Sequence, residues 1–143
     1  MSDTTWVTGG TLVTPGGLVR GALGMRNGRI ISVGGKPAKN DARIDARGRY
    51  VAPGLIDLHI WGEPQAVACE EARQGTTAFL HAIGPESPER LVARLVQLNG
   101  TPIVGGARCL GVHLEGPFLN PLRAGALASW WLRPATSREL RQL

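Results

Sequence analysis

The chain has 143 residues, enough for one domain of ordinary size or for part of a larger one. Hydrophobic residues make up 43% and charged residues 19%, a balance typical of a folded globular protein and not of a disordered chain. No apolar run approaches the roughly 20 residues that cross a bilayer, and the first residues do not read as a secretory signal. With only two cysteines and no motif around them, we expect a cytoplasmic protein that does not bind membranes.

The formal net charge of +5 raises the question of nucleic-acid binding. The arginines are spread from Arg20 to Arg141 without a dense run, and few aromatic residues lie among them. A nucleic-acid site usually combines clustered positive charge with aromatic side chains on which bases stack. We therefore expect a scattered solvated surface and no nucleic-acid partner.

Residues 1–52 show the pattern of short strands separated by turns. Two candidate strands, 6–8 and 11–14, surround Gly9-Gly10, and a longer stretch, 23–33, contains Asn27-Gly28. Asn-Gly is the strongest two-residue hairpin signal because both positions of a type I′ turn need a positive φ. The sequence predicts a small antiparallel β unit over residues 1–52.

From Pro53 onward, residues 53–143, candidate strands alternate with candidate helices. The predicted order is a strand at 55–60, a helix at 64–74, a strand at 76–80, a helix at 88–98 and a strand at 109–114. This alternation is typical of a parallel sheet or barrel, so we expect an α/β domain over residues 53–143.

Polar side chains gather near the ends of the first and third of these strands. Asp57, His59 and Trp61 alternate along one face of the first strand, and His113 and Glu115 share one face of the third. Ligands bind at the carboxyl ends of parallel strands, and imidazole and carboxylate groups suit Zn²⁺. The histidines could equally be core residues, whereas a buried Glu115 would need a charged partner.

Two other features are less informative. His81 follows the second predicted strand, where a single histidine is more often a surface or loop residue than a ligand. Trp130-Trp131 forms an aromatic pair, for which burial in the barrel or in a subunit interface is the simpler interpretation than stacking on a ligand.

Three runs carry a resemblance to a known family. VAPGLIDLHIWG at 51–62 resembles the amidohydrolase signature at the entry to the barrel, and GTTAFL at 75–80 resembles the next such stretch. GVHLEGPFLNP at 111–121 is the most specific run. It is similar to N-acetylglucosamine-6-phosphate deacetylases, more than to dihydroorotases or hydantoinases.

This resemblance implies a β-sandwich-like small domain followed by a (β/α)₈ barrel. Such a barrel takes about 250 residues, so the residues from Pro53 onward hold roughly three of its eight strands. We expect an α/β fold with an N-terminal antiparallel β unit and the first three βα units of an incomplete barrel. We also expect that the chain is a truncated form, inactive alone.

The implied activity is metal-dependent hydrolysis of the acetamide of N-acetylglucosamine 6-phosphate. The resemblance makes Glu115 a metal ligand and His59 a weaker candidate, for one divalent ion that we expect to be Zn²⁺. The aspartate that acts as general base comes from later strands, so we expect no catalytic residue within this chain. The expected partners are an amino-sugar phosphate and, in a full-length protein, a second copy.

The sequence departs from the family pattern at two places. The histidine pair of the first strand is here His59-Ile60-Trp61, and indole cannot ligate a cation, which favours a single metal. Ala126-Leu127 replaces a small residue and a histidine that contacts the sugar, so substrate binding there is weakened or different. Two alternatives stay open: another cyclic-amide or acetamide amidohydrolase, or a non-catalytic fragment.

Overall fold

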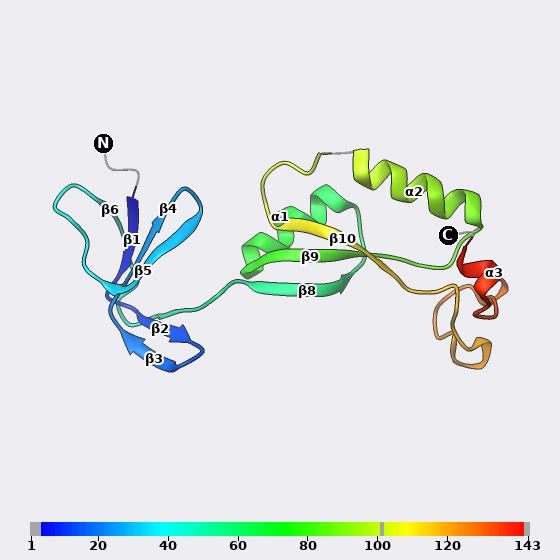
Figure 1. Cartoon of the computed structure of the whole chain (residues 1–143), viewed down its shortest axis with the longest axis horizontal. Helices are drawn as coiled ribbons and strands as arrows, with labels where there is room; N and C mark the ends of the chain where they lie inside the picture. Colours follow the sequence, from blue (N-terminus) through cyan, green and yellow to red (C-terminus); the bar gives the residue numbers. More distant parts are fainter. Residues whose placement is uncertain (1–3, 101, 142–143) are drawn as a thin grey trace. The chain divides into compact units, whose positions relative to one another are not determined.

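The computed structural model describes residues 4–100 and 102–141, which divide into two compact units, 1–53 and 54–143 (Figure 1). Each unit has its own sheets. Within the described ranges, none of the helices is long and apolar enough to span a bilayer.

The N-terminal unit consists of short strands in two sheets. The strands are β1 (Thr4–Thr8), β2 (Thr11–Thr14), β3 (Gly17–Arg20), β4 (Ala22–Arg26), β5 (Arg29–Gly35), β6 (Ala42–Asp45) and β7 (Tyr50–Val51). One sheet has the order β5-β4-β1-β6 and the other the order β3-β2-β7. The predicted hairpin joins β4 to β5, and Asn27 and Gly28 both have positive φ, 51° and 69°.

The prediction that this unit is antiparallel was only partly right. β2–β3, β1–β4 and β4–β5 are antiparallel, but β6 pairs in parallel with β1 and β7 pairs in parallel with β2. The two parallel strands have four and two residues, too few for a pattern of alternation to identify them. Their partners, β1 and β2, are distant in the sequence, so no turn motif next to β6 or β7 predicts the pairing.

In the C-terminal unit, strands and helices alternate. The elements are β8 (Leu55–Ile60), α1 (Pro64–Gln74), β9 (Thr76–Ile83), α2 (Pro88–Gly100) and β10 (Arg108–Leu114). Three shorter elements follow: η1 (Pro121–Arg123), η2 (Ser129–Trp131) and α3 (Ser137–Leu140). β9 lies between β8 and β10, and both pairs are parallel, which confirms the mixed α/β fold (Figure 1).

Helix α1 begins and ends where the sequence predicts. Its N-cap is Glu63, whose carboxylate accepts hydrogen bonds from the backbone N–H groups of Gln65 and Ala66 at 3.1 and 2.7 Å. Both bonds lower the pKa of the Glu63 carboxyl, and the bond from Ala66 has the larger effect. Gly75 ends the helix in the left-handed conformation at φ 91°, and the chain turns directly into β9.

The core of this unit lies between β9 and the helices. Phe79 of β9 is fully buried and contacts a cluster that includes Val67 and Ala68 of α1. Leu91 of α2 is also buried. β8 is an edge strand, and its Leu55 and Leu58 are more than 60% exposed. The helix-covered face of β9 therefore supplies most of the apolar burial.

Replacing Phe79 with alanine tests this assignment of the core. We expect Phe79→Ala to lower the free energy of unfolding by about 3–5 kcal/mol, because a fully buried ring leaves a cavity. Leu122, which is 90% exposed, provides the control: Leu122→Ala should change stability by less than about 0.5 kcal/mol. Urea unfolding followed by circular dichroism measures both, and equal effects would contradict the assignment.

Candidate active site

His59 and Glu115 meet where β8 and β10 end. The distance between His59 Nε2 and Glu115 Oε2 is 3.2 Å, although β9 separates their two strands. About a third of each side chain is exposed, 37% for the histidine and 32% for the glutamate. The structure thus places the two metal-ligand candidates together at the carboxyl ends of the parallel strands.

A second histidine, His113, connects the two strands that carry His59 and Glu115. His113 of β10 reaches across to β8, where its Nδ1 lies 2.9 Å from the carbonyl oxygen of Leu58. Its ring meets the His59 ring edge-on, with centroids 4.5 Å apart. Ala82 of β9 pairs with His113 in the sheet register and is fully buried. The small side chain beside His113 thus belongs to the strand that separates β8 from β10.

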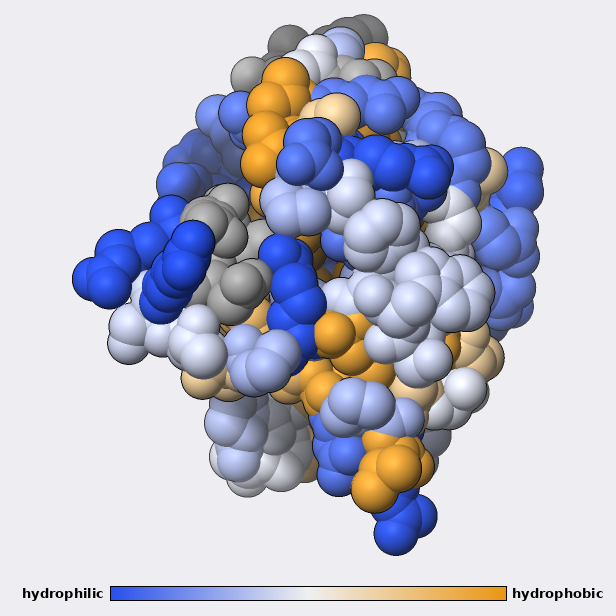
Figure 2. Space-filling model, turned by 90° about the vertical axis from the view of Figure 1, so that its right-hand side faces the viewer, coloured by the Kyte–Doolittle hydropathy of each residue, from blue (hydrophilic) through white to orange (hydrophobic). Residues whose placement is uncertain are grey.

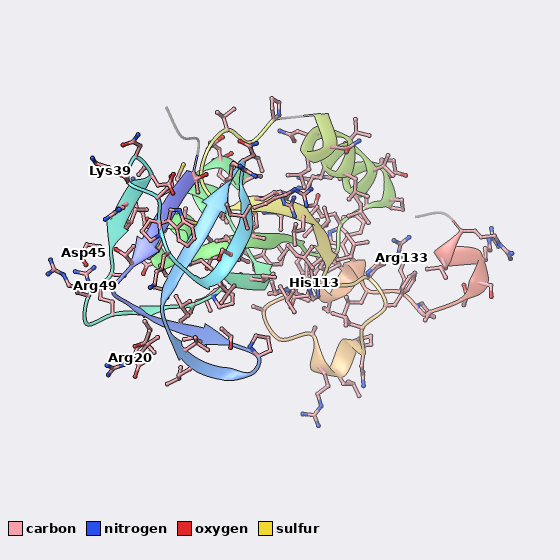
Figure 3. All side chains as sticks on the ribbon, turned by 60° about the vertical axis from the view of Figure 1, so that its left-hand side comes forward. Arg20, Lys39, Asp45, Arg49, His113 and Arg133 are labelled. Atoms are coloured by element: carbon pink, nitrogen blue, oxygen red, sulfur yellow. The ribbon has the colours of Figure 1, made fainter. Side chains whose placement is uncertain are left out.

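The backbone fixes the position of Glu115. Its N–H donates to the carbonyl oxygen of Ile83 at 2.8 Å, which continues the pairing of β10 with β9 by one residue. Gly116 then turns the chain away at φ 112°, a conformation that favours glycine. The carbonyl oxygen of Pro117 accepts a hydrogen bond from the backbone N–H of Arg133 at 2.9 Å. Figure 3 labels His113 and Arg133 in this part of the unit.

Trp61 and Glu115 compete for one atom of His59. The Trp61 indole N–H donates to His59 Nε2 at 3.2 Å, the same nitrogen that faces the Glu115 carboxylate. A ring nitrogen carries either a hydrogen or a lone pair. When its lone pair accepts from Trp61, no hydrogen lies between His59 and Glu115. Asp57 orients the strand itself, since its Oδ1 accepts the backbone N–H of His59 at 2.8 Å.

Leu127 lies on the same side of the site as Trp61. A Cβ atom built on Gly84 would meet Trp61 Cη2 at 2.7 Å and Leu127 Cδ2 at 3.6 Å. Both side chains therefore converge on Gly84, whereas the neighbouring Ala126 is exposed. We did not predict a role for Gly84; the sequence signal that could have found it is a glycine directly after a buried strand.

The described residues supply two candidate ligands and no complete metal cluster. Within residues 4–100 and 102–141, no group of three or more His, Cys, Asp or Glu side chains is arranged to hold a metal ion. Among the described residues, the geometry joins Glu115 to His59 and adds no third ligand to the pair.

His81 is not the surface or loop residue that the sequence suggested. It lies within β9 and is only 5% exposed, and its buried Nδ1 has no hydrogen-bond partner among the residues that the structure describes. It lines a cavity of about 430 Å³, together with Glu63 and Arg94. Burial lowers the pKa of the His81 imidazole; the positive charge of Arg94 lowers it further, and Glu63 opposes the shift.

The burial expected for the tryptophan pair, in the barrel or in a subunit interface, stays a prediction. Trp130 is 78% exposed, so its ring is not buried within this chain. It lies in the short helix η2, and its neighbour Trp131 is half-buried.

Comparison with curated proteins identifies the relatives of this chain. It is 33% identical over 135 residues to N-acetylglucosamine-6-phosphate deacetylase of Bacillus subtilis, a match that covers 80% of this chain and 34% of that protein. It is 34% identical over 137 residues to the human protein of the same name, covering 78% of this chain and 32% of that protein. The chain belongs to the N-acetylglucosamine-6-phosphate deacetylase family. It spans about a third of the length of these relatives.

The chain is also similar to a protein of another name and to two solved structures. D-hydantoinase of Ralstonia pickettii is 38% identical over 76 residues, which covers 53% of this chain and 17% of that protein. The deacetylase of Thermotoga maritima superimposes with a TM-score of 0.67 at 26% identity, over 96% of this chain and 39% of that one. The deacetylase of Pasteurella multocida shares the fold, with a TM-score of 0.79 at 18% identity, over 96% of this chain and 41% of that one. No family model matches the chain.

The buried His81 predicts a pH dependence of stability. Because the pKa of His81 is lower in the folded chain, the unfolded chain binds a proton near its ordinary value of 6.5 while the folded chain does not. Protonation of His81 therefore does not affect the free energy of unfolding above pH 6.5. As the pH decreases below 6.5 it lowers that free energy, and the decrease stops below the pKa of His81 in the folded chain. We expect His81→Leu to remove this component from a plot of unfolding free energy against pH. The same loss of stability between pH 7.5 and 5 in both proteins would contradict the interpretation.

Proposed function

We propose that this chain forms part of the active site of a metal-dependent amidohydrolase that removes the acetyl group of N-acetylglucosamine 6-phosphate. The observation that supports the proposal is the contact of His59 with Glu115 at the carboxyl ends of β8 and β10. The names of the relatives from Bacillus subtilis and human support the substrate. In this proposal the three parallel strands are the beginning of a (β/α)₈ barrel.

The spacing of the two side chains suits a shared cation. Two ligands of a tetrahedral Zn²⁺ at about 2.1 Å each lie about 3.4 Å apart. The distance of 3.2 Å between His59 Nε2 and Glu115 Oε2 is close to this value. A cation between them would also resolve the repulsion of a lone pair facing a carboxylate, provided that the Trp61 N–H gives up its bond to Nε2. Both ligand types suit Zn²⁺.

A divalent ion bound here supplies polarisation of an amide carbonyl and activation of water. The residues of this chain would bind the ion and keep its ligands in position. Glu115 and His59 bind from two strands, Asp57 fixes the backbone of His59, and His113 keeps β10 close to β8. The general base and the further ligands come, in this proposal, from residues other than those described here.

A second candidate is hydrolysis of another amide, such as a cyclic one. Two observations favour it: the match to D-hydantoinase, and the apolar side chains of Trp61 and Leu127 beside the site. The third alternative, a non-catalytic chain, is favoured by the two-ligand site. The cytoplasmic location, the homodimer and the lack of nucleic-acid binding stay predictions.

The metal-ligand role of Glu115 can be tested by zinc binding. We expect Glu115→Gln to weaken Zn²⁺ binding at least about tenfold, because an amide oxygen carries no negative charge to offset that of the ion. Glu71→Gln removes the same charge from helix α1, outside the site, and should leave the affinity unchanged. Isothermal titration calorimetry gives both constants. Equal affinity in the two variants would exclude the ligand role.

The substrate can be tested by acetate release. The product of the complete reading frame, loaded with Zn²⁺, should release acetate from N-acetylglucosamine 6-phosphate. We expect none from the 143-residue chain, because the general base is proposed to lie outside it. Turnover of another amide but not of the sugar phosphate would favour the second candidate. No turnover of any amide by a folded, zinc-loaded protein would favour the third.

A further inference from the structure

We propose that the open edge of strand β6, with the basic residues beside it, is a docking surface for an extended acidic segment of another polypeptide. In this segment acidic and apolar residues alternate, and it adds to the four-stranded sheet as a fifth strand next to β6. The proposal concerns residues 1–53 alone and does not depend on the proposed function.

The net charge of the chain belongs to the N-terminal unit. Residues 1–53 contain eight Arg and Lys against three Asp, whereas residues 54–143 contain eight Arg against eight Asp and Glu. The formal charge of +5 is therefore that of the N-terminal unit. By comparison, Figure 2, onto the side of α2 and α3 in the C-terminal unit, shows apolar residues exposed among hydrophilic ones. An excess of one sign of charge attracts partners of the opposite sign.

Most of these basic residues lie near β6 in the sequence. Five of the eight lie between positions 36 and 49, which include all of β6, and the five side chains are exposed. Figure 3 shows two of them, Lys39 and Arg49, on one side of the unit, at the left of the view. Among the residues that the structure describes, neither Lys39 nor Arg49 forms a salt bridge. Their charges are thus accessible to a ligand.

The same stretch contains two acidic residues, and both are engaged. Asp41 Oδ2 accepts hydrogen bonds from Trp6 Nε1 and from the backbone N–H of Ala38, both at 2.8 Å. Asp45 forms a salt bridge with Arg47, with 2.6 Å between Oδ2 and Nη2. With five basic and two acidic residues, the stretch keeps a net charge of +3.

The backbone of β6 offers hydrogen bonds at its outer edge. Among the described residues, β6 pairs only with β1, and all four residues of β6 are exposed. The backbone N–H of Ala46 donates to the carbonyl oxygen of Thr8 in β1 at 2.8 Å. Because the backbone groups of successive residues in a strand point to opposite sides, those of Arg43 and Asp45 face away from β1. Such unpaired N–H and C=O groups are a template for a further strand.

The side chains of β6 explain why acidic and apolar residues should alternate. Arg43 pairs in register with Trp6, Ile44 pairs with Val7, and Val7 pairs with Leu23. Since register partners share a face and successive residues point to opposite faces, Arg43 and Ile44 lie on opposite faces of the sheet. Ile44 is 53% exposed, so an apolar residue of an added strand extends the row of Leu23, Val7 and Ile44. An acidic residue next to it then lies beside Arg43.

Two other occupants fit this surface less well. A second copy would bring its own basic residues to the same edge, and like charges at an edge oppose pairing. Nucleic acid has no peptide groups to pair with the backbone, and its bases stack on aromatic side chains. Within residues 4–53 the exposed aromatic residue is Tyr50, since Trp6 is only 7% exposed.

The test uses a synthetic peptide in which four glutamates alternate with three valines, labelled with fluorescein and titrated with the 143-residue chain. We expect saturable binding by fluorescence anisotropy at low ionic strength, and weaker binding when salt is added, because salt screens the charges. A peptide of the same composition with its valines in one block, and one with lysine in place of glutamate, should not bind. Arg43→Gln should weaken binding about threefold. Arg123→Gln removes the same charge from an exposed position in the C-terminal unit and should leave the affinity unchanged.

Hydrogen exchange followed by NMR separates strand addition from attraction between charges alone. The backbone N–H groups of Arg43 and Asp45 should exchange more slowly when the peptide is bound, because they donate to its carbonyl groups. The N–H of Ile44, which faces β1, should change little. This measurement needs neither metal nor turnover, so its result is separate from that of the proposed function.

Four outcomes would overturn the proposal. The first is equal binding of the alternating and block peptides, and the second is binding without slower exchange at Arg43 and Asp45. The third is tighter binding of a thymidine oligonucleotide than of the peptide, which would indicate a nucleic-acid surface. The fourth is slower exchange at β6 that grows with protein concentration in the absence of peptide, which would indicate a second copy.

Discussion

The site depends on one contact across three strands, that of His59 with Glu115. β8 and β10 are not neighbours, so their side chains can meet only above β9. The register partner of His113 on β9 is the fully buried Ala82, and the rings of His59 and His113 meet edge-on with centroids 4.5 Å apart. The opposite face of β9 carries Phe79, whose burial against α1 keeps the strand in place. One face of β9 thus contributes to the stability of the unit, and the candidate ligands lie over the other face.

The His59–Glu115 contact also lies next to two apolar side chains. Trp61 holds His59 at the nitrogen that faces Glu115, and its ring extends to the point where Leu127 also packs. A change at either apolar residue therefore acts on the surface next to the candidate cation. The two departures from the family pattern are in this sense a single structural feature, brought together at Gly84.

Local signals made much of this fold predictable. Pro64 and Gly75 bound α1 because proline suits a first helical turn and glycine suits a left-handed end. Alternation along β8 and β10 placed His59 and Glu115 on their strands, and the parallel arrangement brought the strand ends together. The parallel pairing of β6 and β7, the burial of His81 and the role of Gly84 were not predictable. Each depends on residues distant in sequence, which a pattern along the chain does not reveal.

The most direct test of the central claim is X-ray absorption spectroscopy of the zinc-loaded chain. The account predicts nitrogen and oxygen neighbours at about 2.0–2.1 Å together with outer-shell scattering from an imidazole ring. That outer-shell signal should disappear in His59→Ala, and the count of near neighbours should fall in Glu115→Ala. Spectra that are identical for the unmodified chain and both variants would show that the ion binds elsewhere, and would contradict the account.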